Sequence, residues 1–196
     1  MAQESEPPVQ GTQPADDAFA PLKWVADHAA RLGGVPGRLA VAGSSAAANL
    51  AAVVSQLARD HGSPALSGQL LLTPVTDGGP SGGTYDANSE GCIQTRPLMD
   101  WFWDSYADKT ERLDPKASPL RAASLAGLPP AMVVTVEFDP LRDQGDAYAA
   151  ALAKAGVPVR HLPCRGYIPT SITAVGGVAS RRAGSRPDGG GHPRAF

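Results

Sequence analysis

An apolar run that turns abruptly into a helix-prone segment is the feature that most constrains the fold. Residues 38–42 form the apolar run, and the small-residue turn 43–45 separates them from the Ala-rich segment 46–60. This order predicts a buried strand, a tight turn and a helix. A serine on such a turn has its hydroxyl lifted away from the backbone, beside the free N–H groups of the helix. Ser45 is therefore a candidate nucleophile, although a serine before a helix is also a common N-cap residue.

The same kinds of segment alternate along the rest of the chain. The strand-like runs are residues 38–42, 68–75, 131–138 and 157–162, and helical spacing is found in residues 16–34, 45–61, 98–106 and 141–155. Helices that alternate with buried strands are typical of a parallel sheet with right-handed crossovers. We therefore predict an α/β fold with a mostly parallel sheet of about four strands and flanking helices.

The composition places these elements in one domain with loose ends. Residues 1–14 and 179–196 contain little that could be buried, so we expect a disordered lead-in and a disordered tail around a domain at 15–178. Residues 76–91 are rich in Asp, Gly, Pro and Ser and predict an exposed loop, whereas the prolines of 114–130 exclude a long helix. The aromatic residues of the helix near 98–106 are expected to lie mainly in the core.

Charge and cysteine content argue against several classes of partner. A net charge of −2 gives no reason to expect nucleic acid or an anionic membrane as partner. Cys92 and Cys164 have neither metal-ligand spacing nor a disulfide framework, which favours reduced thiols in the cytoplasm. No metal is expected. No cofactor is expected either, because the turn at 43–48 lacks the G-x-G-x-x-G spacing and the lysine of nucleotide-binding loops.

Two side chains that could act together follow different strands. Ser45 comes directly after the first predicted strand, and Asp139 comes directly after the third. Because the carboxyl ends of parallel strands meet at one edge of a sheet, both side chains are expected at that edge. Ester hydrolysis by a serine requires a base oriented by a carboxylate and N–H donors for the oxyanion. This shared position favours the nucleophile over the N-cap interpretation.

Four stretches resemble a known family. Residues 16–24 (DDAFAPLKW), 38–50 around the turn, 69–77 (QLLLTPVTD) and 137–143 (EFDPLRD) are similar to bacterial hormone-sensitive-lipase-like carboxylesterases of the α/β-hydrolase fold. The resemblance extends from about Pro14 to about Gly176. It implies a serine carboxylic-ester hydrolase that cleaves short acyl esters through an acyl-enzyme.

The resemblance also implies roles for individual residues. Ser45 matches the nucleophile, Asp139 matches the carboxylate of the triad, and the backbone N–H of Ala46 matches an oxyanion donor. Asp143 matches a second acidic position of the same motif. The family turn usually reads G-D-S-A-G, whereas Ser44 and Ala47 stand here at its second and fifth positions. The methyl group of the latter is expected to crowd the helix against the strand.

Other family features are absent from this sequence. No H-G-G-G loop and none of the family's first strands precede the turn, so we expect about half the usual sheet, truncated at the N-terminus, with an uncovered edge on its first strand. Pro169–Ser171 stands where the family carries its histidine. His28 and His61 are expected to be solvated, His161 to be packed within a strand, and His192 to lie in the tail.

These features leave two interpretations open. The first is an esterase that acts on small-molecule esters through Ser45 with weak activity. The second is a non-catalytic remnant or interaction module that associates through its exposed sheet edge, for example as a homo-oligomer. Hydrolysis that depends on Ser45 favours the first interpretation, whereas association without acylation favours the second.

Overall fold

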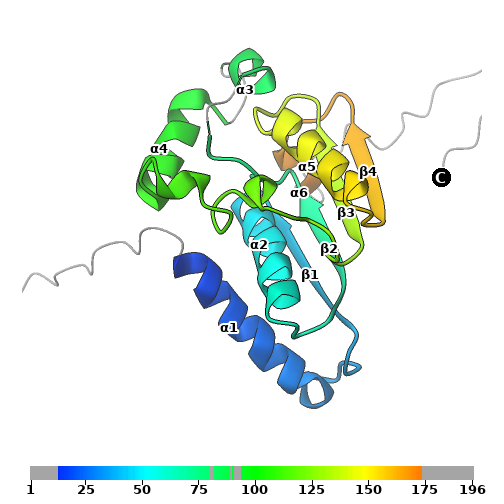
Figure 1. Ribbon diagram of the computed structural model, residues 1–196. Helices are drawn as coiled ribbons and strands as arrows, with labels where there is room; N and C mark the ends of the chain where they lie inside the picture. The colour runs from blue at the N-terminus through cyan, green and yellow to red at the C-terminus, as the bar shows by residue number, and fades with distance from the viewer. Residues whose placement is uncertain (1–12, 80–81, 89, 91–93, 174–196) are drawn as a thin grey trace, which may run out of the picture.

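The computed structural model describes residues 13–79, 82–88, 90 and 94–173 (Figure 1). Almost all of the predicted lead-in and the whole predicted tail therefore lie outside the described residues, as do Cys92 and His192. The first element of the described chain is helix α1, which spans Gln13–Asp27. Pro14 lies in the first turn of this helix, where a proline costs no backbone hydrogen bond.

The predicted parallel sheet is confirmed, and it has four strands. They are β1 (Leu39–Ser44), β2 (Leu66–Leu72), β3 (Ala131–Val136) and β4 (Val159–Cys164), in the spatial order β1-β2-β3-β4. Every neighbouring pair is parallel. The outer edge of β1 is not paired with any strand of the described chain. Because the order in space equals the order in sequence, consecutive carboxyl ends lie side by side.

Three helices cover one face of the sheet (Figure 1). Helix α2 (Ala46–Asp60) packs against β1 and β2, and α5 (Arg142–Lys154) packs against β3 and β4. Helix α1 packs on the outer side of α2. Helix α2 is therefore enclosed on two sides, which explains why its residues 51–58 are all buried. The sheet contributes Leu71 and Val133, which are completely buried beneath these helices.

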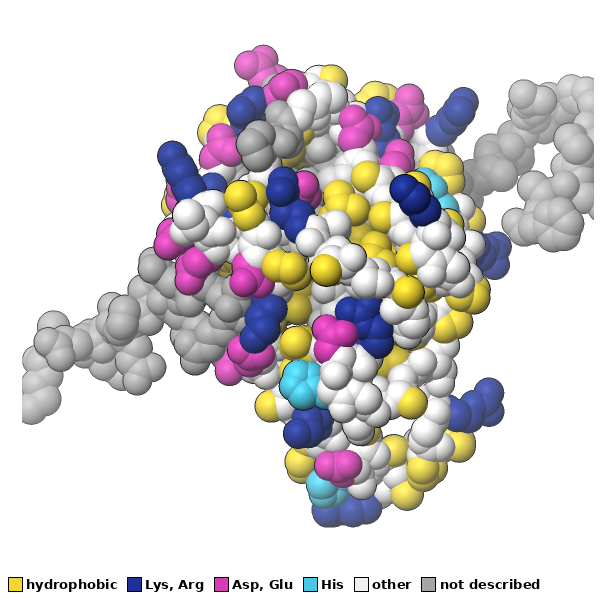
Figure 2. All heavy atoms as spheres, in the orientation of Figure 1, with side chains coloured by type: hydrophobic (Ala, Val, Ile, Leu, Met, Phe, Trp, Pro, Cys, Tyr) yellow, Lys and Arg dark blue, Asp and Glu magenta, His cyan; other side chains and the backbone are white. Residues whose placement is uncertain are grey.

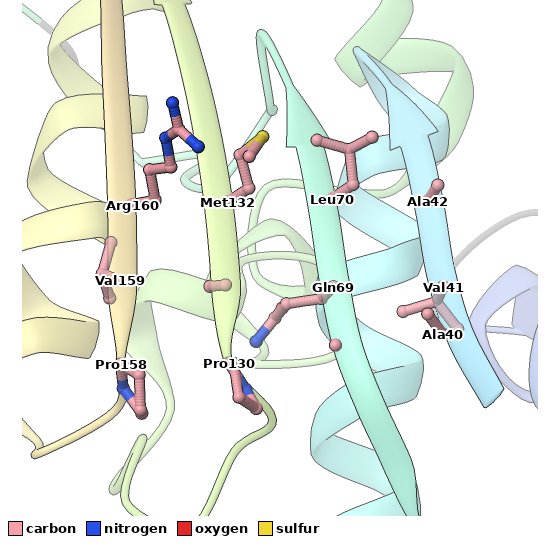
Figure 3. Close-up of a pocket in the computed structure, with 12 residues that line it drawn as sticks. Ala40, Val41, Ala42, Gln69, Leu70, Pro130, Met132, Pro158, Val159 and Arg160 are labelled. Carbon is pink, nitrogen blue, oxygen red and sulfur yellow. The ribbon is translucent and has the colours of Figure 1, made fainter. Parts of the chain in front are cut away.

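The opposite face of the sheet carries a pocket, which Figure 3 shows in close-up. Because side chains alternate along a strand, the neighbours of Leu71 and Val133 in sequence point to this side. Six residues define this surface: Ala40, Ala42, Gly68, Leu70, Met132 and Arg160. A groove of about 680 Å³ lies over it and is lined by residues from all four strands.

Short helices and turns complete the described chain. They are α3 (Thr84–Ala87), α4 (Arg96–Tyr106), α6 (Thr170–Thr173) and the 3-10 turns Ala29–Leu32, Glu111–Leu113 and Pro119–Arg121. The irregular course predicted for residues 114–130 is confirmed. In the part of the chain that the structure describes, no helix has both the length and the apolar character needed to cross a membrane.

The prediction of an exposed loop at residues 76–91 is wrong for three buried residues and for the short helix α3, whereas residues 82, 83, 86, 87 and 90 are exposed. Thr76, Thr84 and Tyr85 are buried. Side chains of α5 satisfy the backbone of this segment: Gln144 Oε1 accepts hydrogen bonds from the N–H groups of residues 76 and 77 at 2.6 and 2.9 Å, and Asp143 Oδ2 accepts one from Thr84 at 2.8 Å. A polar segment can be buried when such distant partners pair its N–H groups.

Candidate active site

Ser45 lies in a strained turn between β1 and α2. Its φ of 56° and ψ of −119° are rare for a residue with a side chain. Backbone hydrogen bonds hold this conformation, because the Ser45 N–H donates to the Leu72 carbonyl at 2.9 Å. The Ser45 carbonyl accepts from Ala48 at 3.0 Å and from Asn49 at 3.1 Å. Strain of this kind characterises a strand-to-helix turn that exposes a nucleophile.

The hydroxyl of Ser45 does not act as a helix cap. No hydrogen bond joins the Ser45 side chain to the first turn of α2. The N-cap interpretation therefore does not account for a serine at this position. As the first residue of α2, Ala46 has an N–H group with no partner inside the helix. The role of this N–H as an oxyanion donor stays a prediction.

The turn depends on the absence of a side chain at Gly43. A Cβ atom built there would lie far closer than 3.0 Å to the backbone of Ala47 and Ala48. The backbone of α2 thus passes directly over the end of β1. The methyl group of Ala47 itself is exposed, so the crowding expected from this side chain does not occur.

Asp139 lies beyond the end of β3 and is completely buried. Its Oδ1 accepts a hydrogen bond from the Leu141 N–H at 2.9 Å, whereas its Oδ2 has no partner among the described residues. Burial raises the pKa of Asp139 to about 6, and the hydrogen bond from Leu141 opposes this shift. A buried carboxylate oxygen without a hydrogen-bond partner destabilises the folded chain. Such groups are typical of functional sites, which makes Asp139 a candidate site residue.

The fold brings Ser45 and Asp139 to the same edge of the sheet but not into contact. Strand β2 separates the two strands that carry them. Two strand spacings amount to roughly 10 Å, too far for a direct hydrogen bond. A group that spans this gap, such as an imidazole ring, is needed to couple the carboxylate to the hydroxyl.

His161 does not occupy that gap. It lies in β4 in register with Val133, at the level of Gly43, with Nε2 3.0 Å from both Thr135 Oγ1 and Asp146 Oδ1. Three strand spacings, roughly 14 Å, separate β4 from β1. The ring is half-buried against α5, so the prediction of a histidine packed within a strand is confirmed.

The other described histidines occupy peripheral positions. His28 stacks on Trp24 and His61 lies against Phe19, both at the outer surface of α1 and α2. Neither is near the carboxyl edge of the sheet, where the candidate residues lie. Pro169 immediately precedes α6.

A cavity of about 360 Å³ opens beside Ser45. It is lined by Ser45, Ala46, Asn49, Leu50, Val75, Gln94, Met99, Phe102, Trp103 and Tyr106. None of these side chains is charged. Such a cavity favours the uncharged, apolar part of a ligand.

The sequence did not predict this role for α4. Its aromatic residues were expected to lie mainly in the core, and Trp103 does so, but Trp101 is 61% exposed and Phe102 is 45% exposed. Phe102 lines the cavity instead. The helical spacing of aromatic residues predicts a helix correctly, but it cannot show whether the apolar side faces the core or a cavity.

Asn49 is a second residue that the sequence analysis missed. It is buried one turn after Ser45, and its Nδ2 donates to the carbonyl oxygens of Val75 at 2.9 Å and Ala117 at 2.7 Å. These bonds tie the first turn of α2 to two loops at the carboxyl edge. The sequence signal was a polar residue among the alanines at the start of this helix.

The described residues contain no group of His, Cys, Asp and Glu side chains that could hold a metal ion. Cys164 is a free thiol at the end of β4. The candidate site contains the hydroxyl of Ser45, the carboxyl of Asp139 and the N–H of Ala46.

Comparison with known proteins agrees with this geometry. The α/β-hydrolase fold family matches residues 7–168. The carboxylesterase NlhH of Mycobacterium tuberculosis is 45% identical over 148 residues, which cover 74% of this chain and 46% of that protein. An ethyl acetate hydrolase of Pseudomonas putida is 37% identical over 150 residues, which cover 74% of this chain and 46% of that hydrolase. The chain thus spans about half the length of the curated relatives it matches.

Solved structures give the same result. The thermostable carboxylesterase EstE1, cloned from a metagenomic library, superposes on this chain with a TM-score of 0.77 and is 43% identical in sequence. The match covers 81% of this chain and 55% of EstE1. A thermostable esterase from Pseudomonas putida superposes with a TM-score of 0.74 and is 46% identical in sequence. The match covers 77% of this chain and 49% of that esterase. On this evidence of sequence, fold and site, the chain belongs to the α/β-hydrolase fold family.

Proposed function

We propose that this chain is a serine carboxylic-ester hydrolase that acts on short acyl esters through an acyl-enzyme on Ser45. The observation that carries the proposal is the strained turn at Ser45. The hydroxyl of this serine makes no capping hydrogen bond to α2, and the residue lines a cavity without charged side chains. The names of the relatives support the same class, since they include carboxylesterases and an ethyl acetate hydrolase. A cavity of about 360 Å³ suits a small acyl or alcohol group.

The proposed chemistry follows the order of acyl transfer. Ser45 Oγ attacks the acyl carbon, its proton passes to a base, and the C–O bond to the alcohol breaks as the alcohol takes up a proton. Water then attacks the acyl-enzyme, releases the carboxylic acid and returns the proton to Ser45. The N–H of Ala46 stabilises the oxyanion in both steps. Asp139 is the carboxylate that would orient such a base once it is protonated.

The base is the missing part of this proposal. We propose that Pro169 occupies the position of the family histidine and that His161 does not replace it. The location of His161 on β4, facing Asp146 rather than Ser45, supports this. Loss of one oxyanion donor alone lowers rates by roughly 10²- to 10³-fold, and a missing base lowers them further. The expected activity is therefore weak.

Hydrolysis of p-nitrophenyl acetate tests the proposal. We expect the wild-type rate to exceed that of Ser45→Ala by about tenfold, whereas the matched variant Ser44→Ala should keep the wild-type rate. Added imidazole, which can supply a base, should raise the wild-type rate more than the Ser45→Ala rate. His161→Gln should change neither rate.

Equal rates for the wild type and Ser45→Ala would contradict the proposed nucleophile. A loss of activity in His161→Gln would contradict the assignment of the base. Circular dichroism of each variant would show that the fold is retained, so that a lost rate reports chemistry rather than unfolding.

We also propose that the substrate is a small uncharged ester, that the protein is cytoplasmic and that the chain associates with itself. The free thiol of Cys164 supports the location, and the unpaired outer edge of β1 supports association. A non-catalytic role is the weaker proposal, because it gives no reason for the strained turn at Ser45 or for the buried carboxyl of Asp139.

A further inference from the structure

The wall of the cavity beside Ser45 is uncharged but not wholly apolar. The face of the molecule drawn in Figure 2 carries interspersed acidic and basic side chains, whereas none of the side chains that line this cavity is charged. Besides Ser45, three of the lining side chains are polar, namely Asn49, Gln94 and Tyr106. Buried polar groups in proteins are normally hydrogen-bonded, so polar atoms that lack a partner here indicate what the cavity binds.

Asn49 has an amide oxygen that the described chain leaves unpaired. Its Nδ2 donates to two carbonyl oxygens, those of Val75 and Ala117. Because both partners are acceptors, they determine which end of the amide is the nitrogen, and Oδ1 points away from them. Oδ1 accepts no hydrogen bond from the described residues, and it is not among the buried atoms that lack a partner. It is therefore an accessible acceptor on a residue that lines the cavity.

The position of Asn49 on α2 directs this acceptor toward the nucleophile. The backbone N–H of Asn49 donates to the Ser45 carbonyl at 3.1 Å, so the two residues lie one helical turn apart. One turn rises about 5.4 Å, and the side chains of a helix lean toward its N-terminus. The carboxamide of Asn49 is thus directed toward the turn that carries Ser45.

Gln94 and Tyr106 add two more unpaired groups to the same wall. Gln94 Oε1 and Tyr106 Oη are both buried, and neither has a hydrogen-bond partner. Burial raises the pKa of Tyr106, so its phenol keeps the proton that it can donate. A wall that bound only hydrocarbon would be more stable with apolar residues at these positions, because unpaired buried polar atoms are unfavourable.

We propose that the cavity beside Ser45 selects esters that carry a hydroxyl group, which donates a hydrogen bond to Asn49 Oδ1. A hydroxyl is an uncharged donor, whereas a carbonyl or ether oxygen has no proton for this acceptor. An ammonium or carboxylate group would meet no opposite charge in the cavity wall. The hydroxyl lies a few bonds from the ester carbonyl, on the acyl or the alcohol part. This inference rests on the proposed function, because it places the ester at Ser45.

Ligand binding to Ser45→Ala measures this preference without turnover. Methyl β-hydroxybutyrate and methyl isovalerate have the same shape but differ by a hydroxyl on the acyl part, and hydroxyethyl butyrate and propyl butyrate differ in this way on the alcohol part. In NMR titrations we expect the hydroxyl-bearing ester of one pair to bind about fivefold more tightly than its apolar partner. The pair that shows the preference identifies the part of the ester that carries the hydroxyl. Equal or weaker binding of the hydroxyl-bearing ester in both pairs would overturn the inference.

Asn49→Leu in the same background should abolish the preference, because leucine keeps the size of the side chain but has no acceptor. The matched control is Gln56→Leu. Gln56 is also a buried amide on α2 and donates to the Pro119 carbonyl at 3.0 Å, but it does not line the cavity. This control should keep the preference. Loss of the preference in both variants would show that it depends on the packing of α2 rather than on the Asn49 oxygen.

The two proposals fail in different ways. A hydroxyl preference in binding without hydrolysis of p-nitrophenyl acetate by the wild type would contradict the proposed function and leave this inference standing. Hydrolysis that depends on Ser45, without any hydroxyl preference, would overturn this inference alone. If Asn49→Leu does not fold, as circular dichroism would show, the two ester pairs on Ser45→Ala still decide the question.

Discussion

Replacing Gly43 with alanine is expected to destabilise the protein by more than about 3 kcal/mol, enough to leave much of the chain unfolded. The new Cβ atom would overlap backbone atoms of Ala47 and Ala48, and backbone cannot rotate away as a side chain can. Relief requires α2 to move off the end of β1. That helix is buried on two sides, so its displacement would disrupt the packing of both the sheet and α1.

Urea denaturation of Gly43→Ala measures this effect, and Gly68→Ala is the matched control. Both glycines lie in parallel strands, but a Cβ at Gly68 makes only an ordinary contact at 3.5 Å. The control should change the free energy of unfolding by less than about 1 kcal/mol. Similar losses in the two variants would show that the close approach at Gly43 does not govern the turn.

Replacing Asp139 with asparagine is expected to stabilise the protein at neutral pH. The asparagine Oδ1 can still accept the hydrogen bond from Leu141, and the side chain carries no charge to bury. Burial raises the pKa of Asp139 to about 6 in the folded chain, whereas an unfolded aspartate titrates near ~4. The difference corresponds to about 2 to 3 kcal/mol.

The pH dependence of this effect has a definite sign. Between about pH 4 and pH 6 the folded chain retains a proton that the unfolded chain releases, so wild-type stability falls as the pH rises through this interval. The Asp139→Asn variant lacks this loss. Its advantage in the free energy of unfolding should be near zero at pH 4 and fully present at pH 7 and above.

Chemical denaturation at pH 4 and pH 8 measures the difference directly. The control Asp17→Asn removes an exposed carboxylate and should leave the free energy of unfolding nearly unchanged at both values. A variant Asp139→Asn that is less stable than the wild type at pH 8 would contradict the account of this carboxyl as a buried, unpaired group. Such a group is retained at the expense of stability when function requires it.

The alternation of strands and helices was predictable from the sequence because each element repeats its own pattern. The apolar runs that became β1 to β4 are bounded by glycine and proline, and their order along the chain matches their order in the sheet. The positions of Ser45 and Asp139 followed from the same reasoning. Both come directly after strands, so a parallel sheet had to bring them to one edge.

Long-range contacts were not predictable in this way. Nothing near Thr84 in the sequence indicates that Asp143 pairs its backbone N–H, or that Gln144 does the same for residues 76 and 77. The segment therefore resembled an exposed loop. The aromatic spacing of α4 likewise predicted a helix but not that Phe102 faces the cavity beside Ser45.

The choice between N-cap and nucleophile also required the structure. Serine is common at both positions, and the difference lies in a backbone φ of 56° and in a side-chain hydrogen bond that is not made. Neither quantity is encoded in local composition. The requirement for glycine at position 43 comes from the structure, in which an added Cβ would overlap the backbone of Ala47 and Ala48.

Labelling with a fluorophosphonate, read by mass spectrometry of the digested protein, tests the central claim that the fold activates Ser45 as a nucleophile. We predict one adduct, on the peptide that contains Ser45, in the native protein and in Ser44→Ala. No adduct should form in Ser45→Ala or in urea-unfolded protein. An unlabelled Ser45, or a Ser45 labelled equally fast in native and unfolded chains, would show that the turn does not activate this serine.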